Sequence, residues 1–183
     1  DVSIKTELCE ILEDLRKSGP PLRGIVHAAV VYDDCLISSI EEQSIAKVFG
    51  PKVDAVGHLH DLTTGLDLDA FVVFSSIATV VGNVGQAAYV AANMALEQMM
   101  RHRRSLGLAA TSVRWGPIGD SGVLTREPSV RDLLEERTGV LSMASADALD
   151  ALGSVLENAV SDVTIARTNA TLKEGEVTPV LTR

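Results

Sequence analysis

Short apolar runs alternate along this chain with longer segments in which apolar residues recur at helical spacing. The apolar runs lack strict alternation, which is typical of strands buried in a parallel sheet, and they lie at 24–31, 69–76, 109–116 and 162–169. The helical pattern covers 6–19, 38–65, 85–107, 129–139 and 145–160. Repeated strand–helix–strand order predicts an α/β fold, a doubly wound parallel sheet with helices on both faces.

Local signals refine these boundaries. Gly50–Pro51 interrupts the pattern of 38–65 and predicts a break or kink, and Ser39 with Glu42 predicts a capping box. In an open parallel sheet, ligands bind beyond the carboxyl ends of the strands. We therefore expect His27–Val30, Ser75–Ser76 and Trp115–Ile118 to line one crevice.

Composition narrows the function classes. Hydrophobic residues make up 46% of the 183 positions and aromatic residues only 3%, so the core must consist mainly of Val, Leu, Ile and Ala. A net charge of −9 argues against binding of nucleic acid, which requires a basic face. The basic cluster Arg101–Arg104 is interpreted as the solvated last turn of a helix, with docking of an acidic partner as the weaker alternative.

The compartment and the metal content follow from a few residues. Cys9 and Cys35 have no metal-ligand spacing, so a reducing, cytoplasmic location fits best. No apolar run reaches the roughly 18 residues that a membrane span needs, and no signal peptide is visible. His58 and His60 do not share a helix face, and we predict no metal site.

The stretch "FSSIATVVGNVGQAAYVAAN" carries the candidate chemistry. Tyr89 and Asn93 are four residues apart on one predicted helix, and Ser76 ends the preceding strand. Lys52 follows Pro51 and can point to the same crevice. A nearby ammonium stabilises a phenolate, so tyrosine with lysine makes a general acid, and serine adds a second donor to a developing oxyanion. Carbonyl reduction, with hydride from a cofactor, is the reaction that needs this set.

Spacing alone leaves an equally good structural interpretation. Ser76 would then cap its loop, Tyr89 would pack against the sheet, and Asn93 would bond to backbone. His27 is expected to be a packed strand-end histidine rather than an acid.

The chain closely resembles the ketoreductase domain of modular polyketide synthases and animal-type fatty acid synthases, within the short-chain dehydrogenase/reductase superfamily. The blocks "PKV", "FSS", "GQAAYVAAN", "RRSLGL" and "WGPIGDSG" occur in the family's order. The resemblance implies reduction of β-ketoacyl groups on the phosphopantetheine of acyl carrier protein by NADPH, beside neighbouring synthase domains. It assigns catalytic roles to Tyr89, Ser76, Lys52 and Asn93, with the exchange of lysine and asparagine that is typical of this family.

The resemblance also implies a cofactor site and a product. Besides Lys52 and Tyr89, the residues implied to bind the cofactor are Asp1, Val2, His27, Ala28, Ala29, Trp115, Gly116, Pro117 and Ile118. "YDD" at 32–34 is similar to the family's "LDD", and Val81 stands where the opposite stereochemical class has tryptophan, which favours a B-type product. The carboxylates of this motif could guide the pantetheine arm or simply be solvated.

We expect 1–168 to be the catalytic subdomain, incomplete at its N-terminus, and 169–183 to be a polar tail or linker. The family's glycine-rich phosphate loop is absent, so this stretch alone is expected to bind NADPH weakly and to expose the flank of its first strand. A non-catalytic, reductase-like structural half of a synthase is the main alternative, and a stand-alone dehydrogenase is the third. Retention of Tyr89, Ser76, Lys52 and Asn93 favours the reductase.

Overall fold

The computed structural model describes residues 1–121, 132 and 135–168 of the chain. They form two compact units, the first containing Asp1–Ser75 and Gly82–Ser112 and the second containing Ser76–Val81 and the residues from Val113 onward.

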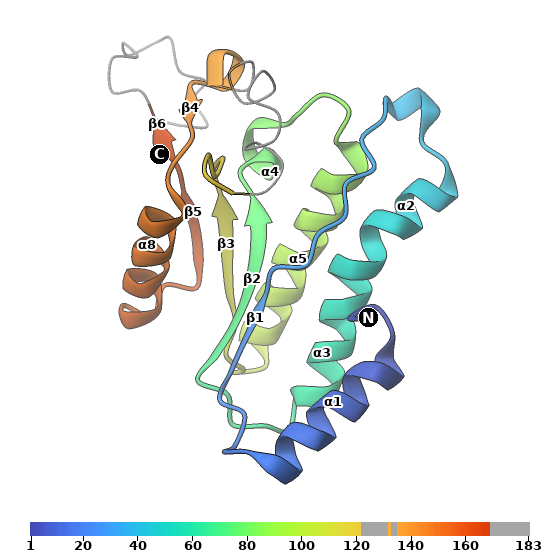
Figure 1. Ribbon diagram of the computed structural model, residues 1–183, viewed down its shortest axis with the longest axis vertical. Coiled ribbons are helices and arrows are strands. Elements are labelled where there is room, and N and C mark those ends of the chain that lie inside the picture. Colours follow the sequence, from blue (N-terminus) through green and yellow to red (C-terminus); the bar gives the residue numbers. More distant parts are fainter. Residues whose placement is uncertain (122–131, 133–134, 169–183) are drawn as a thin grey trace. The chain divides into compact units, whose positions relative to one another are not determined.

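The elements alternate along the chain in the predicted order (Figure 1). Those lying wholly or mainly in the first unit are α1 (Lys5–Ser18), β1 (Gly24–His27), η1 (Ile37–Ser39), α2 (Glu42–Phe49), η2 (Gly50–Asp54), α3 (Ala55–Thr63), β2 (Ala70–Ser76) and α5 (Ala87–Ser105). Those of the second unit are α4 (Ala78–Val81), β3 (Thr111–Trp115), β4 (Val140–Leu141), α8 (Ser145–Glu157), β5 (Asp162–Ile165) and β6 (Arg167–Thr168).

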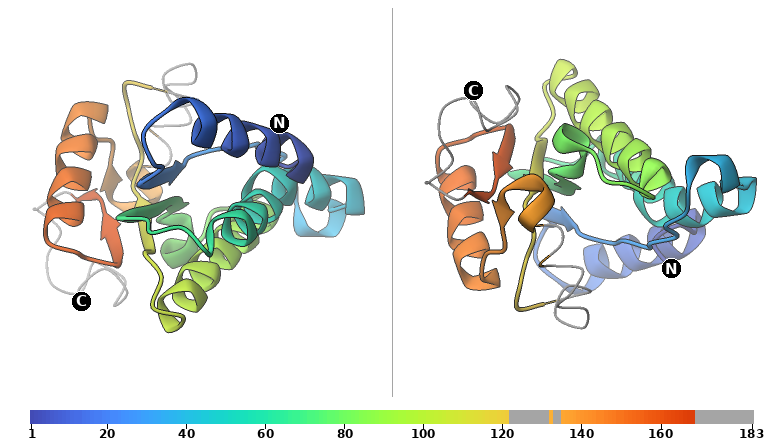
Figure 2. Two further views of the ribbon diagram at one scale, coloured as in Figure 1. Left: turned by 90° about the horizontal axis from the view of Figure 1, so that it is seen from below. Right: turned by 90° about the horizontal axis from the view of Figure 1, so that it is seen from above.

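Four strands form one sheet in the order β1-β2-β3-β5. Strands β1 and β2 are parallel, with Gly24 opposite Ala70 and His27 opposite Val73. Within the first unit, α1, α3 and α5 lie on the same side of β1 and β2 (Figure 2), where they share one core. The predicted α/β fold with a parallel sheet is confirmed.

Several boundaries differ from the sequence pattern. Strand β1 ends at His27, and residues 28–36 have no regular structure although their apolar run continues to 31. Helix α2 begins after Glu41 without a side-chain cap, and Ser39 belongs to η1, so the predicted capping box is wrong. The strand predicted at 162–169 is two strands, because β6 leaves the parallel sheet to pair antiparallel with β4. In the predicted helix 129–139, residues 132 and 135–138 are helical, and 129–131 and 133–134 lie outside the described residues, as does the predicted tail 169–183.

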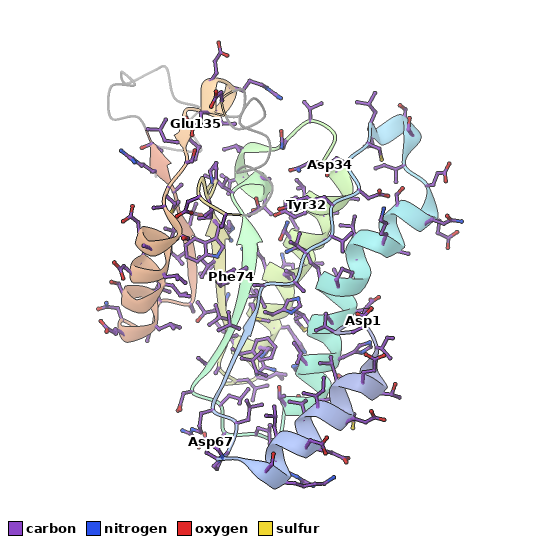
Figure 3. All side chains as sticks on the ribbon, viewed as in Figure 1. Asp1, Tyr32, Asp34, Asp67, Phe74 and Glu135 are labelled. Carbon is purple, nitrogen blue, oxygen red and sulfur yellow. The ribbon has the colours of Figure 1, made fainter. Side chains whose placement is uncertain are left out.

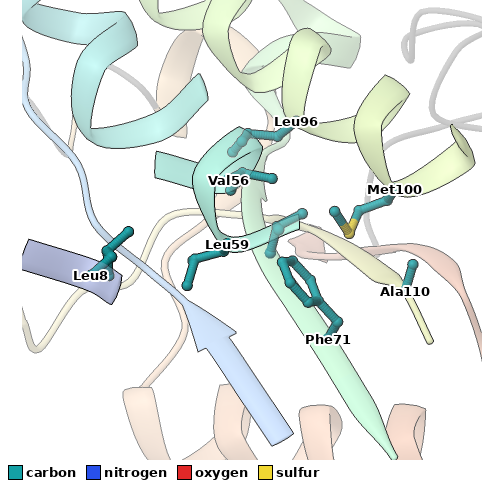
Figure 4. Packing of buried hydrophobic residues seen from close by; sticks show 8 residues of the cluster. Leu8, Val56, Leu59, Phe71, Leu96, Met100 and Ala110 are labelled. Carbon is teal, nitrogen blue, oxygen red and sulfur yellow. The ribbon is translucent and has the colours of Figure 1, made fainter. Parts of the chain in front are cut away.

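The core of the first unit joins helices and strands as the composition requires. Its side chains come from α1, α3, β2, α5 and the segment before β3, and are Leu8, Val56, Leu59, Phe71, Val73, Leu96, Met100 and Ala110 (Figure 4). Phe71 is the only aromatic residue in this cluster. Burial of these apolar side chains holds the helices against the strands.

Arg103 corrects the interpretation of the basic cluster. Its side chain is 1% exposed, and its guanidinium carbon lies 3.9 Å from the centroid of the Phe71 ring. Its Nε donates to the carbonyl oxygen of Ala109 at 3.1 Å, and Nη1 lies 3.1 Å from Nδ1 of His60. Arg103 is therefore a core residue and not part of a solvated helix turn.

The predicted interruption at Gly50–Pro51 is confirmed, and its form is a π-helical turn. Residues Gly50–Asp54 form η2, which connects α2 to α3 without a gap. Proline has no N–H to donate to the helix, so the hydrogen-bond ladder must adjust around it. Turns of this type recur at functional sites, and Lys52 lies within this one.

Two absences concern the described residues only. None of their helices is long and apolar enough to cross a membrane. They also contain no group of three or more metal-binding side chains.

Candidate active site

Lys52 is a buried cation directed at the candidate proton donor. It is 3% exposed, and its Nζ donates to the carbonyl oxygen of Phe74 at 3.1 Å. The same Nζ lies 5.5 Å from the centroid of the Tyr89 ring. Burial lowers the pKa of Lys52 to about 8 because desolvation disfavours the ammonium form. The prediction that lysine and tyrosine converge is borne out within the first unit.

Tyr89 lies in the first turn of α5 and is held by packing. Its ring contacts the buried cluster formed by Val48 of α2 and by Ala88 and Ala92 of α5. The Tyr89 ring also lies beside the ring of Tyr32. The two ring centroids are 5.0 Å apart, and the ring planes are tilted by 37°. A tyrosine fixed in this way presents its hydroxyl in a restricted direction.

Asn93 follows one helical turn after Tyr89 and is fully buried. Its Nδ2 donates to the carbonyl oxygen of Tyr89 at 2.9 Å, which is the backbone contact that the structural interpretation predicted. Its Oδ1 is buried and has no hydrogen-bond partner in the described part of the chain. Buried acceptors are nearly always satisfied, so this atom is available to a donor supplied from outside.

Ser76 ends β2, two residues after Phe74, and opens the second unit. Its Oγ accepts a hydrogen bond from the N–H of Ala78 at 3.1 Å, so it does cap the loop into α4. The contacts of the first unit join Lys52, Tyr89 and Asn93 but do not include Ser76. Its catalytic role remains a prediction.

His27 is a buried, neutral strand-end residue, as predicted. It is 4% exposed, and its pKa is lowered to about 4, mainly by burial and then by the charge of Lys52, while a hydrogen bond with the Pro51 backbone opposes both. Its Nε2 has no partner among the described residues. His27 therefore contacts the residue that precedes Lys52 and keeps one ring nitrogen open.

The other residues predicted to bind cofactor in the first unit lie at two places. Asp1 is exposed, and its carboxylate accepts hydrogen bonds from the N–H and the hydroxyl of Ser3, while Val2 packs against the main core. Ala28 is exposed and Ala29 is half-buried, directly after β1.

In the second unit, the predicted loop Trp115–Ile118 is tightly packed. The N–H of Gly116 donates to Ile165 at 2.8 Å, and the carbonyl oxygen of Pro117 accepts from Met143 at 2.9 Å. A Cβ at Gly116 would lie 3.1 Å from Ala166, so a larger residue would displace the backbone. Ile118 forms a parallel bridge with Met143. The loop is thus tied by backbone contacts to other parts of its own unit.

Sequence reasoning missed the contact between Tyr32 and Tyr89. The residues 32–35 are here called the pinned segment, and Figure 3 labels two of them, Tyr32 and Asp34. Both acidic side chains of the segment bind other parts of the chain. Asp33 pairs with Lys47 of α2 at 2.8 Å, Asp34 accepts from Nε2 of Gln86 at 2.9 Å, and the N–H of Cys35 donates to Gly85 at 2.9 Å. The carboxylates of "YDD" are therefore engaged with the protein. The motif marked the segment, but nothing in the sequence indicated that its first residue faces Tyr89.

Comparison with known proteins identifies the family of the chain. Residues 1–120 match the model of the KR domain. The chain is 40% identical over 157 residues to the phenolphthiocerol synthesis polyketide synthase type I Pks15/1 of Mycobacterium bovis, covering 85% of this chain and 7% of that protein. It is 39% identical over 157 residues to the related Pks1 of Mycobacterium tuberculosis, whose name describes it as inactive, covering 85% of this chain and 10% of that protein.

A solved structure titled as A-type ketoreductases from a modular polyketide synthase superimposes with a TM-score of 0.86 at 41% identity. The match covers 92% of this chain and 35% of that one, so the chain spans about a third of the solved ketoreductase and a small fraction of the synthases. Three findings lead to one conclusion: residues 1–120 match the family model, the relatives are polyketide synthases, and the α/β fold is shared. This chain belongs to the ketoreductase (KR) domain family of polyketide synthases, within the short-chain dehydrogenase/reductase superfamily.

Proposed function

We propose that this chain carries the catalytic residues of an NADPH-dependent reductase that converts a β-ketoacyl thioester on acyl carrier protein to the β-hydroxyacyl thioester. One observation carries the proposal. The buried Lys52 ammonium, fixed on the carbonyl oxygen of Phe74, lies 5.5 Å from the ring of Tyr89. A structural half of a synthase has no need of a buried cation beside a phenol, since burial of that charge costs free energy.

The proposed chemistry is a proton transfer from Tyr89. The O–H bond of the phenol breaks as an O–H bond forms on the substrate's carbonyl oxygen. Lys52 in its ammonium form stabilises the phenolate that remains, because an opposite charge at this range favours the charged form. Ser76 is proposed to donate a second hydrogen bond to the same substrate oxygen. Asn93 is proposed to bind, through its open Oδ1, a donor that helps return a proton to Tyr89.

The residues present fit a nicotinamide cofactor. His27 Nε2 and Asn93 Oδ1 are buried polar atoms without partners in the described part of the chain, as expected where a bound group supplies donors. Ala28 and Ala29 leave the backbone after β1 accessible. When bound, NADPH supplies the hydride that the carbonyl carbon requires. We propose that His27, Ala28 and Ala29 hold it, together with Asp1, Val2, Lys52, Tyr89 and Trp115–Ile118.

The proposed partners are the acyl carrier protein with its phosphopantetheine-bound substrate and the neighbouring domains of the synthase. The setting is proposed to be the cytoplasm, because Cys9 and Cys35 are both free thiols.

The test is product formation. The chain is assayed as given and within the polypeptide that its gene encodes, with a β-ketoacyl thioester and NADPH or NADH, and products are identified by mass spectrometry. We expect the β-hydroxyacyl thioester, formed faster with NADPH. A folded protein that binds NADPH yet forms no product would support the alternative, a structural reductase-like half, as in the relative whose name describes it as inactive. Chiral analysis of the product also tests the expected B-type configuration.

A further inference from the structure

Tyr32 is the second phenol of the candidate active site. The chain contains two tyrosines in total, and their rings lie 5.0 Å apart, centroid to centroid. They come from different places in the sequence, since Tyr89 is on α5 and Tyr32 follows β1 in a segment without regular structure. Aromatic pairs at this separation attract each other, so each ring restricts the other.

The position of Tyr32 is set by three contacts of the pinned segment. The ion pair from Asp33 to Lys47 ties it to α2, and the bond from Gln86 to Asp34 ties it to the residue before α5. The backbone bond from Cys35 to Gly85 adds a contact that does not depend on side chains. All three lie within three residues of Tyr32 in the sequence, so the ring is held in place although Tyr32 is 42% exposed.

Tyr89 also affects the titration of Tyr32. The pKa of Tyr32 is raised above its ordinary value, mainly by its partial burial, then by the charge of Tyr89 and a hydrogen bond with Tyr89, with a smaller contribution from Asp34. Tyr32 is therefore protonated at neutral pH. A neutral phenol beside Tyr89 can donate a hydrogen bond to it.

We propose that Tyr32 is a positioning residue for Tyr89: its ring, fixed by the pinned segment, orients the Tyr89 phenol, and its hydroxyl donates a hydrogen bond to Tyr89 when Tyr89 gives up its proton. This inference rests on the proposed function of Tyr89 as the proton donor. Lys52 stabilises the Tyr89 phenolate by its charge, and the Tyr32 hydroxyl adds a hydrogen-bond donor to the same phenolate.

The kinetic test separates the hydroxyl from the ring. Tyr32→Phe removes only the hydroxyl, and we expect kcat to fall roughly three- to tenfold with KM unchanged, the size of one net hydrogen bond. Tyr32→Leu also removes the ring and should lower kcat further. Leu36→Ser is the matched control, because Leu36 is 61% exposed and lies one residue beyond the pinned segment. Wild-type kcat in Tyr32→Phe would overturn the inference.

A second measurement does not depend on activity. Biosynthetic replacement of tyrosine by 3-fluorotyrosine, which ionises at lower pH, gives one ¹⁹F resonance for each of the two tyrosines. In Tyr89→Phe, the Tyr32 resonance should titrate at lower pH than in the parent, because the charge and the hydrogen bond of Tyr89 are gone. An unchanged midpoint would show that the phenols do not interact and would overturn the inference.

These two readouts distinguish the failures. If the parent forms no product but the ¹⁹F titrations are coupled, the proposed function fails and the pairing of the phenols stands. If the parent is active and Tyr32→Phe matches it in kcat and KM, the function stands and the positioning role fails.

Discussion

At the scale of single residues, the site depends on charges that burial has perturbed. At an exposed position, Lys52 would be an ordinary surface cation. Here it is 3% exposed, donates to one backbone carbonyl oxygen and has a pKa lowered to about 8. The sequence predicted that Lys52 and Tyr89 meet, because the strand ends of a parallel sheet share one edge. It did not predict that Arg103 is buried or that Tyr32 contacts Tyr89, because long-range packing decides which face of a helix or loop is covered.

The pKa of Lys52 predicts the alkaline limit of activity. Its pKa is lowered by desolvation, so the ammonium form dominates below about pH 8 and is lost above it. We expect kcat of the parent to fall as pH rises through this value. Lys52→Met should lower kcat at pH 7 between about tenfold and a thousandfold and remove this limb. A pH–rate profile checks this, and an identical alkaline limb in Lys52→Met would assign it to another group.

His27 predicts a loss of stability in acid. Its pKa is about 4 in the folded chain and lies near 6.5 when unfolded, so the unfolded chain binds more protons between these values. The contribution is therefore present above pH 6.5 and is lost as pH falls toward 4, by about 2 kcal/mol between pH 7 and pH 5. Urea unfolding at the two pH values measures it. His27→Phe should lack most of this difference; if it retains the whole difference, the linkage belongs to other residues.

At the scale of elements, α5 connects the site to the core. Tyr89 lies in its first turn, the buried Asn93 lies one turn later, and Arg103 in its last turn packs on the Phe71 ring. The long helix and its end at Gly107 could be predicted from apolar spacing and glycine. The orientation of Arg103 could not, because a run of basic residues at a helix end is usually solvated. The sequence pattern predicted an interruption at Gly50–Pro51 but not the π-helical form of Gly50–Asp54.

We predict that two arginines of the same basic cluster contribute very differently to the stability of the fold. Arg103→Ala should lower the free energy of unfolding by about 3 kcal/mol, because it empties a packed position and leaves the Ala109 carbonyl oxygen without its donor. Arg101→Ala, at an exposed position of the same turn, should change it by less than about 0.5 kcal/mol. Chemical denaturation of both variants provides the comparison. Equal effects would mean that Arg103 is not buried in solution.

At the scale of the whole chain, alternation of strands and helices was sufficient to predict the parallel α/β architecture that the strand order now shows. Strand β4 escaped prediction, and β6 was predicted only as the end of one strand at 162–169, because a two-residue strand has no periodicity to detect. The candidate site was predicted from residue types and a family resemblance rather than from periodicity. Its unpredicted part, the pinned segment with Tyr32, lies where the chain has no regular structure and hence no pattern to extrapolate.

The most direct test of the account is the Tyr89→Phe variant, assayed for oxidation of NADPH with a β-ketoacyl thioester in the polypeptide that its gene encodes. Phenylalanine keeps the packing of the ring against Val48, Ala88 and Ala92 and removes only the proton donor. The account predicts a fall in kcat of about a hundredfold or more, with NADPH still bound. If Tyr89→Phe turns over the substrate as fast as the parent, Tyr89 is not the proton donor and the proposed mechanism is wrong.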